Sequence, residues 1–225
     1  SYGFSHYVLG LNIDSKGLEN IPIKNSLINL YGACKDINNA LSIFNSIEFP
    51  DIVTYNTMMA VYINNYDNQS VLKLYKEMTH DIQSKDIRCH ILVIQACINC
   101  IDFKTGQHII STLINQDTGK DGDAQLETKF IEFYAAFNQI SKAKDIFNSM
   151  TQSKRSIDCN NIMLQTYLNY GNYEDVIMLY DTIKFSKRNP LTHSFAITAC
   201  IKTNDYKNGK SIHKKISAQH LKDHH

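Results

Sequence analysis

The stretch FPDIVTYNTMMAVY, Phe49 to Tyr62, decides the fold of this 225-residue chain, because versions of it recur along the sequence. KNSLINLY ends at Tyr31 and NNIMLQTY ends at Tyr167, with an Asn six residues before the Tyr in each of the three stretches. The last residues of six such stretches serve as anchors: Tyr31, Tyr62, Cys97, Tyr134, Tyr167 and Cys200. The anchors are spaced by 31, 35, 37, 33 and 33 residues. These intervals are typical of a helix-turn-helix repeat.

Residues at fixed distances after each anchor fall into columns. Five residues on stand Asp36, Asp67, Asp102, Gln139, Asn172 and Asp205. Asp and Asn side chains accept from the free N–H groups at a helix start, so a second helix is expected to begin there. Small, large and apolar columns follow at nine, thirteen and sixteen residues: Ala40, Val71, Gly106, Ala143, Val176 and Gly209; Phe44, Tyr75, Ile110, Phe147, Tyr180 and His213; Ile47, Met78, Leu113, Met150, Ile183 and Ile216. This i, i+4, i+7 stripe predicts an amphipathic helix, and its recurrence argues against an irregular bundle with coincidental spacing.

Composition fits an all-helical chain and limits the alternatives. Three prolines and nine glycines are too few for an all-β or disordered chain, and the apolar fraction of 43% is ample for a core. The net charge of +1 neither demands nor excludes nucleic acid. No apolar run reaches the roughly 18 residues of a membrane span. The six cysteines, scattered through helical contexts, are interpreted as reduced, buried thiols.

A longer period links every third unit. Cys97 and Cys200 lie 103 residues apart, and IQACINCIDFKTGQHI resembles ITACIKTNDYKNGKSI. Tyr31 and Tyr134 are also 103 residues apart. Three variants of the unit therefore alternate in order, and the duplicated element is a triplet.

PDIVTYNTMMAVYINNYDNQSVLKLYKEM, which follows Phe49, resembles the pentatricopeptide repeat, a helical hairpin of about 35 residues that stacks into an RNA-binding solenoid. ACINCIDFKTGQHI and ACIKTNDYKNGKSIH resemble the long variant of the PLS subclass, and NSLINLYGACKDINNALSIFNSIEFPD resembles the short one. The resemblance implies an all-α fold, a right-handed α-solenoid superhelix of helix-turn-helix repeats. The expected units are 1–20 (second half of a long repeat), 21–51 (short), 52–86 (ordinary), 87–123 (long), 124–156 (short), 157–189 (ordinary) and 190–225 (long).

The resemblance also implies which residues read RNA bases. In this family the fifth residue of the first helix and the last residue of the unit together select one base. The implied pairs are Asn25 with Asp51, Asn56 with Asp86, Thr128 with Ser156, and Asn161 with Asn189. The family associates Asn/Asp with uridine, Asn/Asn with cytidine and Thr with a purine, which gives U-U-x-purine-C. Ile91 of the long unit cannot hydrogen-bond a base, so that unit is expected to space or pack rather than read.

The second residue of each first helix is the expected stacking position. Pro22, Val53 and Leu191 suit contact with a base, whereas Asp158 repels phosphate. The alternative for the Asn residues is that they are ordinary solvent-facing side chains in an Asn-rich chain.

Family resemblance implies single-stranded RNA as partner, with other RNA-editing or processing proteins as further candidates, and a mitochondrial or other organellar setting whose targeting peptide lies outside this chain. The implied function is that of an organellar RNA-processing or C-to-U RNA-editing factor. The alternative is a protein-binding scaffold of the tetratricopeptide kind, against which stands the absence of Trp and of its Leu-Gly pattern.

No catalysis, cofactor or metal is expected in this chain. It contains no H-x-E with P-C-x-x-C, so a deaminase would have to follow in the full-length protein. Cys97-Ile-Asn-Cys100 lacks a second ligand pair for zinc. DTGKDGDAQLE, from Asp117 to Glu127, is interpreted as a turn because Gly119 and Thr128 replace calcium ligands.

Overall fold

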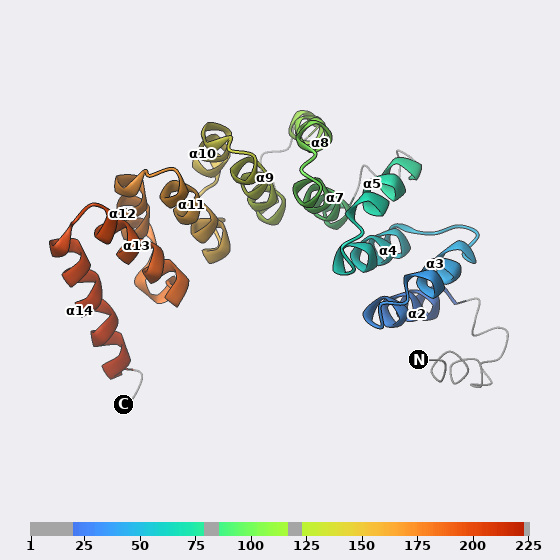
Figure 1. Cartoon of the computed structure of the whole chain (residues 1–225), viewed down its shortest axis with the longest axis horizontal. Helices are drawn as coiled ribbons and strands as arrows, with labels where there is room; N and C mark the ends of the chain where they lie inside the picture. The colour runs from blue at the N-terminus through green and yellow to red at the C-terminus, as the bar shows by residue number, and fades with distance from the viewer. Residues whose placement is uncertain (1–19, 79–85, 117–122, 223–225) are drawn as a thin grey trace. The chain divides into compact units, whose positions relative to one another are not determined.

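The computed structural model describes residues 20–78, 86–116 and 123–222, and all of the regular secondary structure of these residues is helical (Figure 1). The chain divides into two compact units, residues 1–109 and 110–225, each described below by itself. The expected half-repeat at 1–20 falls almost wholly outside the described residues, as does most of the turn after Asp117. None of the described helices is long and apolar enough to cross a membrane.

The first unit is built of successive helical hairpins. Its helices are α2 (Ile21–Ala33), α3 (Ile37–Asn45), α4 (Ile52–Asn64), α5 (Asn68–Glu77), α7 (Ile87–Asn99) and the start of α8 (Phe103–Gln116). Helix α2 packs on α3 and on α4, and α4 packs in turn on α5 and α7. Helices α2 and α4 therefore each contact both their own partner and the first helix of the next hairpin.

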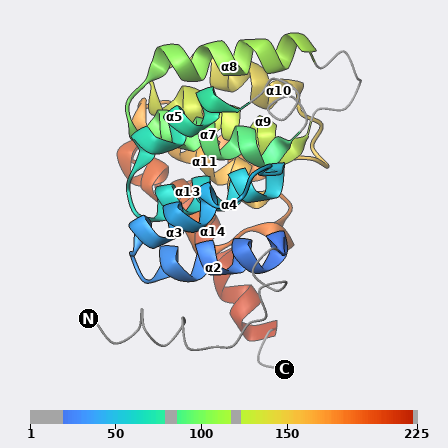
Figure 2. The ribbon, with the colours of Figure 1, turned by 90° about the vertical axis from the view of Figure 1, so that its right-hand side faces the viewer.

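The second unit repeats this pattern. It contains the rest of α8, then α9 (Ala124–Ala136), α10 (Ile140–Ser149), α11 (Ile157–Asn169), α12 (Tyr173–Thr182), the 3-10 turn η1 (Phe185–Lys187), α13 (Pro190–Lys202) and α14 (Tyr206–Lys222). Helix α9 packs on α10 and α11, α11 on α12 and α13, and α13 on α14. Figure 2 shows the same helices turned by 90° from the view of Figure 1. The predicted all-α class is confirmed.

The expected columns form the core. Five of the six anchors are buried, and Tyr31 is half-buried. The small residues Ala40, Val71, Ala143 and Val176 are fully buried. Of the large column, Phe44, Phe147 and Tyr180 are buried, but His213 is exposed. The i, i+4, i+7 stripe thus faces the interior in every hairpin up to α12.

The second helices begin at the expected caps, with one correction. Asp36, Asp67, Asp102 and Asp205 each accept from the backbone N–H three residues on, at 3.0–3.2 Å. Asn172 was expected to do the same, but its side chain makes no capping bond. Glu174 and Asp175 stand instead in the first turn of α12, where negative charge favours the helix dipole.

A left-handed residue ends every first helix, four positions after the anchor. These residues have φ between 55° and 74°: Lys35, Tyr66, Ile101, Asn138, Gly171 and Asn204. The next N–H then bonds the anchor carbonyl at 2.8–2.9 Å in all six turns. Gly171 adopts this conformation without steric cost, and Asn138 and Asn204 tolerate it, whereas Lys35, Tyr66 and Ile101 carry strain that the packing of the hairpin offsets.

The predicted burial of all six cysteines is confirmed at four positions, is wrong at Cys34 and is only partly met at Cys100. Cys34 is exposed and Cys100 is half-buried, whereas Cys89, Cys97, Cys159 and Cys200 are buried. All six are free thiols. Cys34 lies just after the end of α2, where the chain turns at the surface.

Candidate nucleic-acid interface

Three of the first helices have a buried asparagine as their fifth residue, near the place where the next hairpin packs, which we call a junction. The six first helices begin at residues 21, 52, 87, 124, 157 and 190. Their fifth residues include Asn25, Asn56 and Asn161, with only 8%, 7% and 6% of their surface exposed. The alternative that these three are solvent-facing polar side chains is therefore wrong. Thr128 is half-buried, and its hydroxyl donates to the Ala124 carbonyl at 2.6 Å.

The last residue of each unit caps the helix that follows. Asp51 Oδ1 accepts from the Thr54 backbone N–H at 2.8 Å, and Asp86 Oδ1 accepts from the Cys89 N–H at 2.7 Å. Ser156 and Asn189 cap their helices in the same way, at 3.0 and 2.9 Å. The cap fixes each of these side chains at the mouth of the junction, because its oxygen is held by the first turn.

Two of the four expected pairs meet directly. The side-chain N–H of Asn56 donates to Asp86 Oδ1 at 3.0 Å, and that of Asn161 donates to Asn189 Oδ1 at 3.2 Å. Among the described residues, no hydrogen bond joins Asn25 to Asp51 or Thr128 to Ser156. The structure thus brings residues 28 and 30 positions apart together into one polar group at each of two junctions.

Two of the expected reading residues have a buried amide oxygen with no hydrogen-bond partner. In the described part of the chain, Asn25 Oδ1 and Asn56 Oδ1 are inaccessible to solvent and make no hydrogen bond. An unpaired buried carbonyl costs about 1–3 kcal/mol, so such groups are uncommon in folded proteins. Asn161 differs, because the Thr192 hydroxyl donates to its Oδ1 at 2.8 Å. The two junctions of the first unit therefore each contain a buried acceptor oxygen without a hydrogen-bond partner.

The expected stacking residues lie on the surface beside these amides. Pro22 is exposed, and Val53 and Leu191 have 57% and 51% of their surface accessible. Residues two and five of a helix are neighbours on one face, since they are three positions apart. Each junction with Pro22 or Val53 thus pairs an exposed apolar group with a buried amide. Arg88, Gln125 and Asp158 at the same position are also exposed.

The cysteines do not form a reactive centre. Burial raises the pKa of Cys89 and of Cys97 to about 12, so both remain neutral thiols near pH 7. Among the described residues, no group of three or more His, Cys, Asp and Glu side chains is placed to hold a metal ion.

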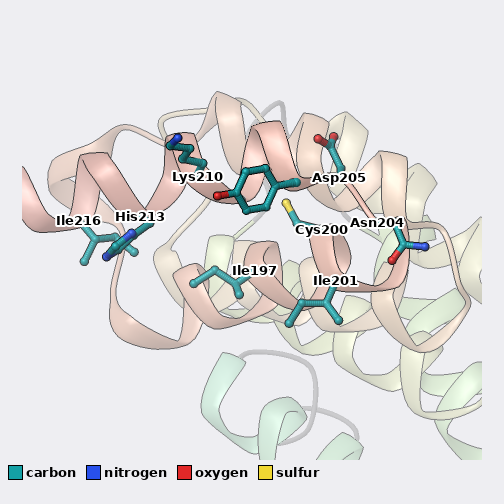
Figure 3. Close-up of a pocket in the computed structure, with 10 residues that line it drawn as sticks. Ile197, Cys200, Ile201, Asn204, Asp205, Lys210, His213 and Ile216 are labelled. Atoms are coloured by element: carbon teal, nitrogen blue, oxygen red, sulfur yellow. The ribbon is translucent and has the colours of Figure 1, made fainter.

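A pocket of about 640 Å³ lies between α13 and α14. Figure 3 shows Ile197, Cys200 and Ile201 of α13 across from His213 and Ile216 of α14. The residues 33 positions earlier occupy the same places on α11 and α12, where Leu164 and Tyr180 are buried and α13 packs. The lining therefore has the character of a hairpin-packing face rather than of a small-molecule site.

A histidine links the last two hairpins of the second unit. Tyr180 Oη and His193 Nδ1 are 2.9 Å apart, and the Arg188 guanidinium lies 3.9 Å from the centre of the Tyr180 ring. Burial, and then the charge of Arg188, lowers the pKa of His193 below its ordinary value of 6.5. The neutral imidazole is the form that the fold stabilises.

Acid is therefore expected to destabilise the second unit through His193. Since the folded state binds this proton more weakly than the unfolded state, the stabilisation is complete above the unfolded pKa of 6.5 and is lost as the pH falls through the lower folded pKa. Thermal melts between pH 8 and pH 5 should show a smaller decrease in Tm for His193→Gln than for the unchanged chain. His213→Gln, at an exposed histidine, is the control; equal decreases in all three proteins would contradict the assignment.

Comparison with known proteins finds similarity to a family of helical repeats. The model of the PPR repeat matches residues 24–48 and 53–81. These two segments are similar to PPR repeats. The two matched segments cover most of α2 and all of α3, and most of α4 and all of α5, and they include the expected reading residues Asn25 and Asn56.

Relatives match over most of this chain. A pentatricopeptide repeat-containing protein of Arabidopsis thaliana is 23% identical over 183 residues, which is 80% of this chain and 29% of the relative. A chloroplastic one is 24% identical over 173 residues (76% and 23%), and a mitochondrial one is 24% identical over 207 residues (91% and 20%). The chain thus spans less than a third of the length of these relatives.

Among solved structures, the crystal structure of the pentatricopeptide repeat protein PPR10 from maize has a TM-score of 0.60. It is 16% identical in sequence, and the match covers 97% of this chain and 37% of that one. This likeness shows a shared helical-repeat fold.

Sequence reasoning missed the third residue of the following helix. Thr54, Cys89, Cys159 and Thr192 occupy this position beneath the four expected reading residues, and all are fully buried. Because two of them are threonines and two are cysteines, they form no column of one residue type and cannot be told from ordinary core residues in the sequence. The only available signal was their constant distance of three residues from the cap.

Proposed function

We propose that this chain is a non-catalytic module that binds single-stranded RNA with sequence selectivity, within an organellar RNA-processing or C-to-U RNA-editing factor. The observation that carries the proposal is the unpaired, buried Oδ1 of Asn25 and of Asn56 at successive junctions. Each lies on the same helix face as an exposed apolar residue, Pro22 or Val53. A base inserted at such a junction gains a hydrogen bond to the amide and an apolar contact to its face.

The base assignment follows the four pairs. Asn25/Asp51 and Asn56/Asp86 select uridine, Asn161/Asn189 selects cytidine, and Thr128/Ser156 selects a purine. With one base over the long unit, the target is U-U-x-purine-C. The long, short and ordinary alternation of the PLS subclass accounts for the third position of the target, which is not read, since Ile91 is apolar. Relatives named chloroplastic and mitochondrial support an organellar setting.

Binding to RNA strands of two kinds tests the proposal. Fluorescence anisotropy should show binding of a single-stranded oligonucleotide that contains U-U-x-purine-C and much weaker binding of the same sequence in a duplex, whose base edges are already paired. Affinity for the single strand should fall as salt rises from about 50 to 200 mM, because phosphate contacts release counterions. A scaffold that binds only proteins would bind neither RNA. Equal affinity for strand and duplex would overturn the proposed reading of bases.

A further inference from the structure

We propose that the third residue of the following helix is a specificity-determining residue, because it decides whether the carbonyl oxygen of the reading amide is free for a base. Thr192 takes up this oxygen at the Asn161–Asn189 junction, whereas the oxygens of Asn25 and Asn56 stay free. The inference rests on the proposed reading of bases and adds a third side chain to each pair.

At the Asn189 junction the hydrogen bonds fix where the hydroxyl proton goes. Asn189 Oδ1 accepts from the Thr192 backbone N–H at 2.9 Å and from the Asn161 side-chain N–H at 3.2 Å. A carbonyl oxygen has two lone pairs, and both are then used. The Thr192 hydroxyl lies 2.8 Å from both Asn189 Oδ1 and Asn161 Oδ1. Its single proton is therefore directed to Asn161 Oδ1, which has capacity left.

The Thr192 hydroxyl is also held from the other side. Its oxygen accepts from the Asn189 backbone N–H at 3.2 Å, which completes a capping box, and the side chain is fully buried. The amide of Asn161 is locked in one orientation as a result. What remains for a ligand at this junction are N–H groups, the second one of Asn161 and those of Asn189.

The junction at Asp51 also has a threonine at this position, Thr54, but its hydroxyl donates to a different acceptor. The Thr54 hydroxyl donates to Asp51 Oδ1 at 2.8 Å. An ionised carboxylate is a stronger acceptor than a neutral amide, so it captures the proton. Asn25 Oδ1 is left without a partner.

At the Asp86 junction a cysteine replaces the threonine. Cys89 is fully buried, and its thiol is a weak donor. Asp86 Oδ1 accepts from the Cys89 N–H and from the Asn56 side chain, while Asn56 Oδ1 has no partner. A reading carbonyl is thus satisfied only where an Asn cap and a Thr occur together.

This difference matches the chemistry of the two pyrimidines. At the same place on the Watson–Crick edge, uracil carries the N3–H donor and cytosine carries an N3 acceptor. A free Oδ1 at Asn25 or Asn56 accepts from uracil N3–H. The Asn161 junction offers only N–H groups and suits the cytosine acceptor. The third residue therefore reinforces the discrimination that the cap begins.

The first test changes Thr192 and measures affinity for two oligonucleotides that differ only in C or U at the last position of U-U-x-purine-C. Thr192→Cys installs the residue found at Cys89, frees Asn161 Oδ1, and should lower the C-to-U affinity ratio by roughly three- to tenfold, the effect of one hydrogen bond. Thr192→Ser keeps the hydroxyl and should keep the ratio. Circular dichroism confirms that each variant is folded.

A second test adds the hydroxyl where it is absent and does not depend on Thr192. Asp86→Asn alone leaves Asn56 Oδ1 free above Cys89, whereas Asp86→Asn with Cys89→Thr satisfies it. The double variant should favour C over U at the second position by about threefold or more relative to the single one. Cys89→Thr alone should leave the U preference unchanged, because Asp86 captures the proton as Asp51 does from Thr54.

The outcomes separate the two proposals. The role of the third residue is supported if the C-to-U affinity ratio falls when the hydroxyl at residue 192 is removed and rises when one is added at residue 89 in the Asp86→Asn variant. Unchanged ratios in Thr192→Cys and in the Asp86→Asn, Cys89→Thr pair, with selective RNA binding retained, overturn this inference and leave the proposed function standing. Failure of the unchanged chain to bind RNA selectively overturns both.

Discussion

Asn25→Leu is expected to stabilise the folded chain and, together with Asn56→Leu, to weaken RNA binding by about a hundredfold. The Asn25 side chain makes no hydrogen bond among the described residues, and its Oδ1 is buried without a partner. Leucine has nearly the same shape and removes the unsatisfied group, which contributes roughly 1 kcal/mol to stability. The loss of two hydrogen bonds to bases, about 1–1.5 kcal/mol each, gives the decrease in affinity.

A gain in the free energy of unfolding together with a loss of RNA affinity distinguishes a base-reading role of these amides from a role in packing. Urea denaturation followed by circular dichroism gives the first quantity, and fluorescence anisotropy with a U-U-x-purine-C oligonucleotide gives the second. Asn29→Leu is the matched control, because it makes the same chemical change at an exposed position of α2. A less stable Asn25→Leu chain, or a double variant that binds as tightly as the unchanged one, would show that these amides are structural.

Phe133→Ala is expected to destabilise the second unit by about 4 kcal/mol. The side chain is fully buried in α9, with its ring centre 5.4 Å from that of Tyr134 and 4.7 Å from that of Phe137. Truncation leaves a cavity that the neighbouring rings cannot fill without leaving their rotamers. In a helical-repeat array each hairpin contacts only its neighbours, so the loss should be concentrated in the hairpins around α9.

Hydrogen exchange measured by mass spectrometry locates that effect, and urea denaturation gives its size. Phe49→Ala removes an aromatic ring of which 78% is exposed and should change the free energy of unfolding by less than about 0.5 kcal/mol. Equal stability of the Phe133→Ala chain and the unchanged chain would mean that α9 does not pack as described.

Much of the hairpin architecture could be predicted because it depends on local chemistry. The aspartate column locates the starts of second helices at Asp36, Asp67, Asp102 and Asp205, where capping follows from the side chain itself. Asn172 has the same potential but makes no capping bond. The left-handed turns were hidden because Lys35, Tyr66 and Ile101 are residues that disfavour that conformation. Tertiary packing overrides local preference there.

The site was only partly accessible to sequence reasoning. Spacing identifies Asn25, Asn56 and Asn161 as equivalent residues, but a spacing gives the face of a helix and not the depth of a side chain. Their burial depends on the next hairpin, which also supplies the cap. The roles of Thr192 and Cys89 depend on competition between acceptors within about 3 Å, as the distances around Asn189 and Asp86 show. Such competition is fixed by three-dimensional geometry.

The central claim is that amides at the hairpin junctions read bases in order along a single strand. The most direct measurement is the affinity of this chain for a single-stranded RNA containing U-U-x-purine-C and for a scrambled RNA of the same composition, at one salt concentration. We predict at least about tenfold tighter binding to the ordered sequence, since several junctions each contribute a hydrogen bond. Equal affinity for the two RNAs would contradict the account.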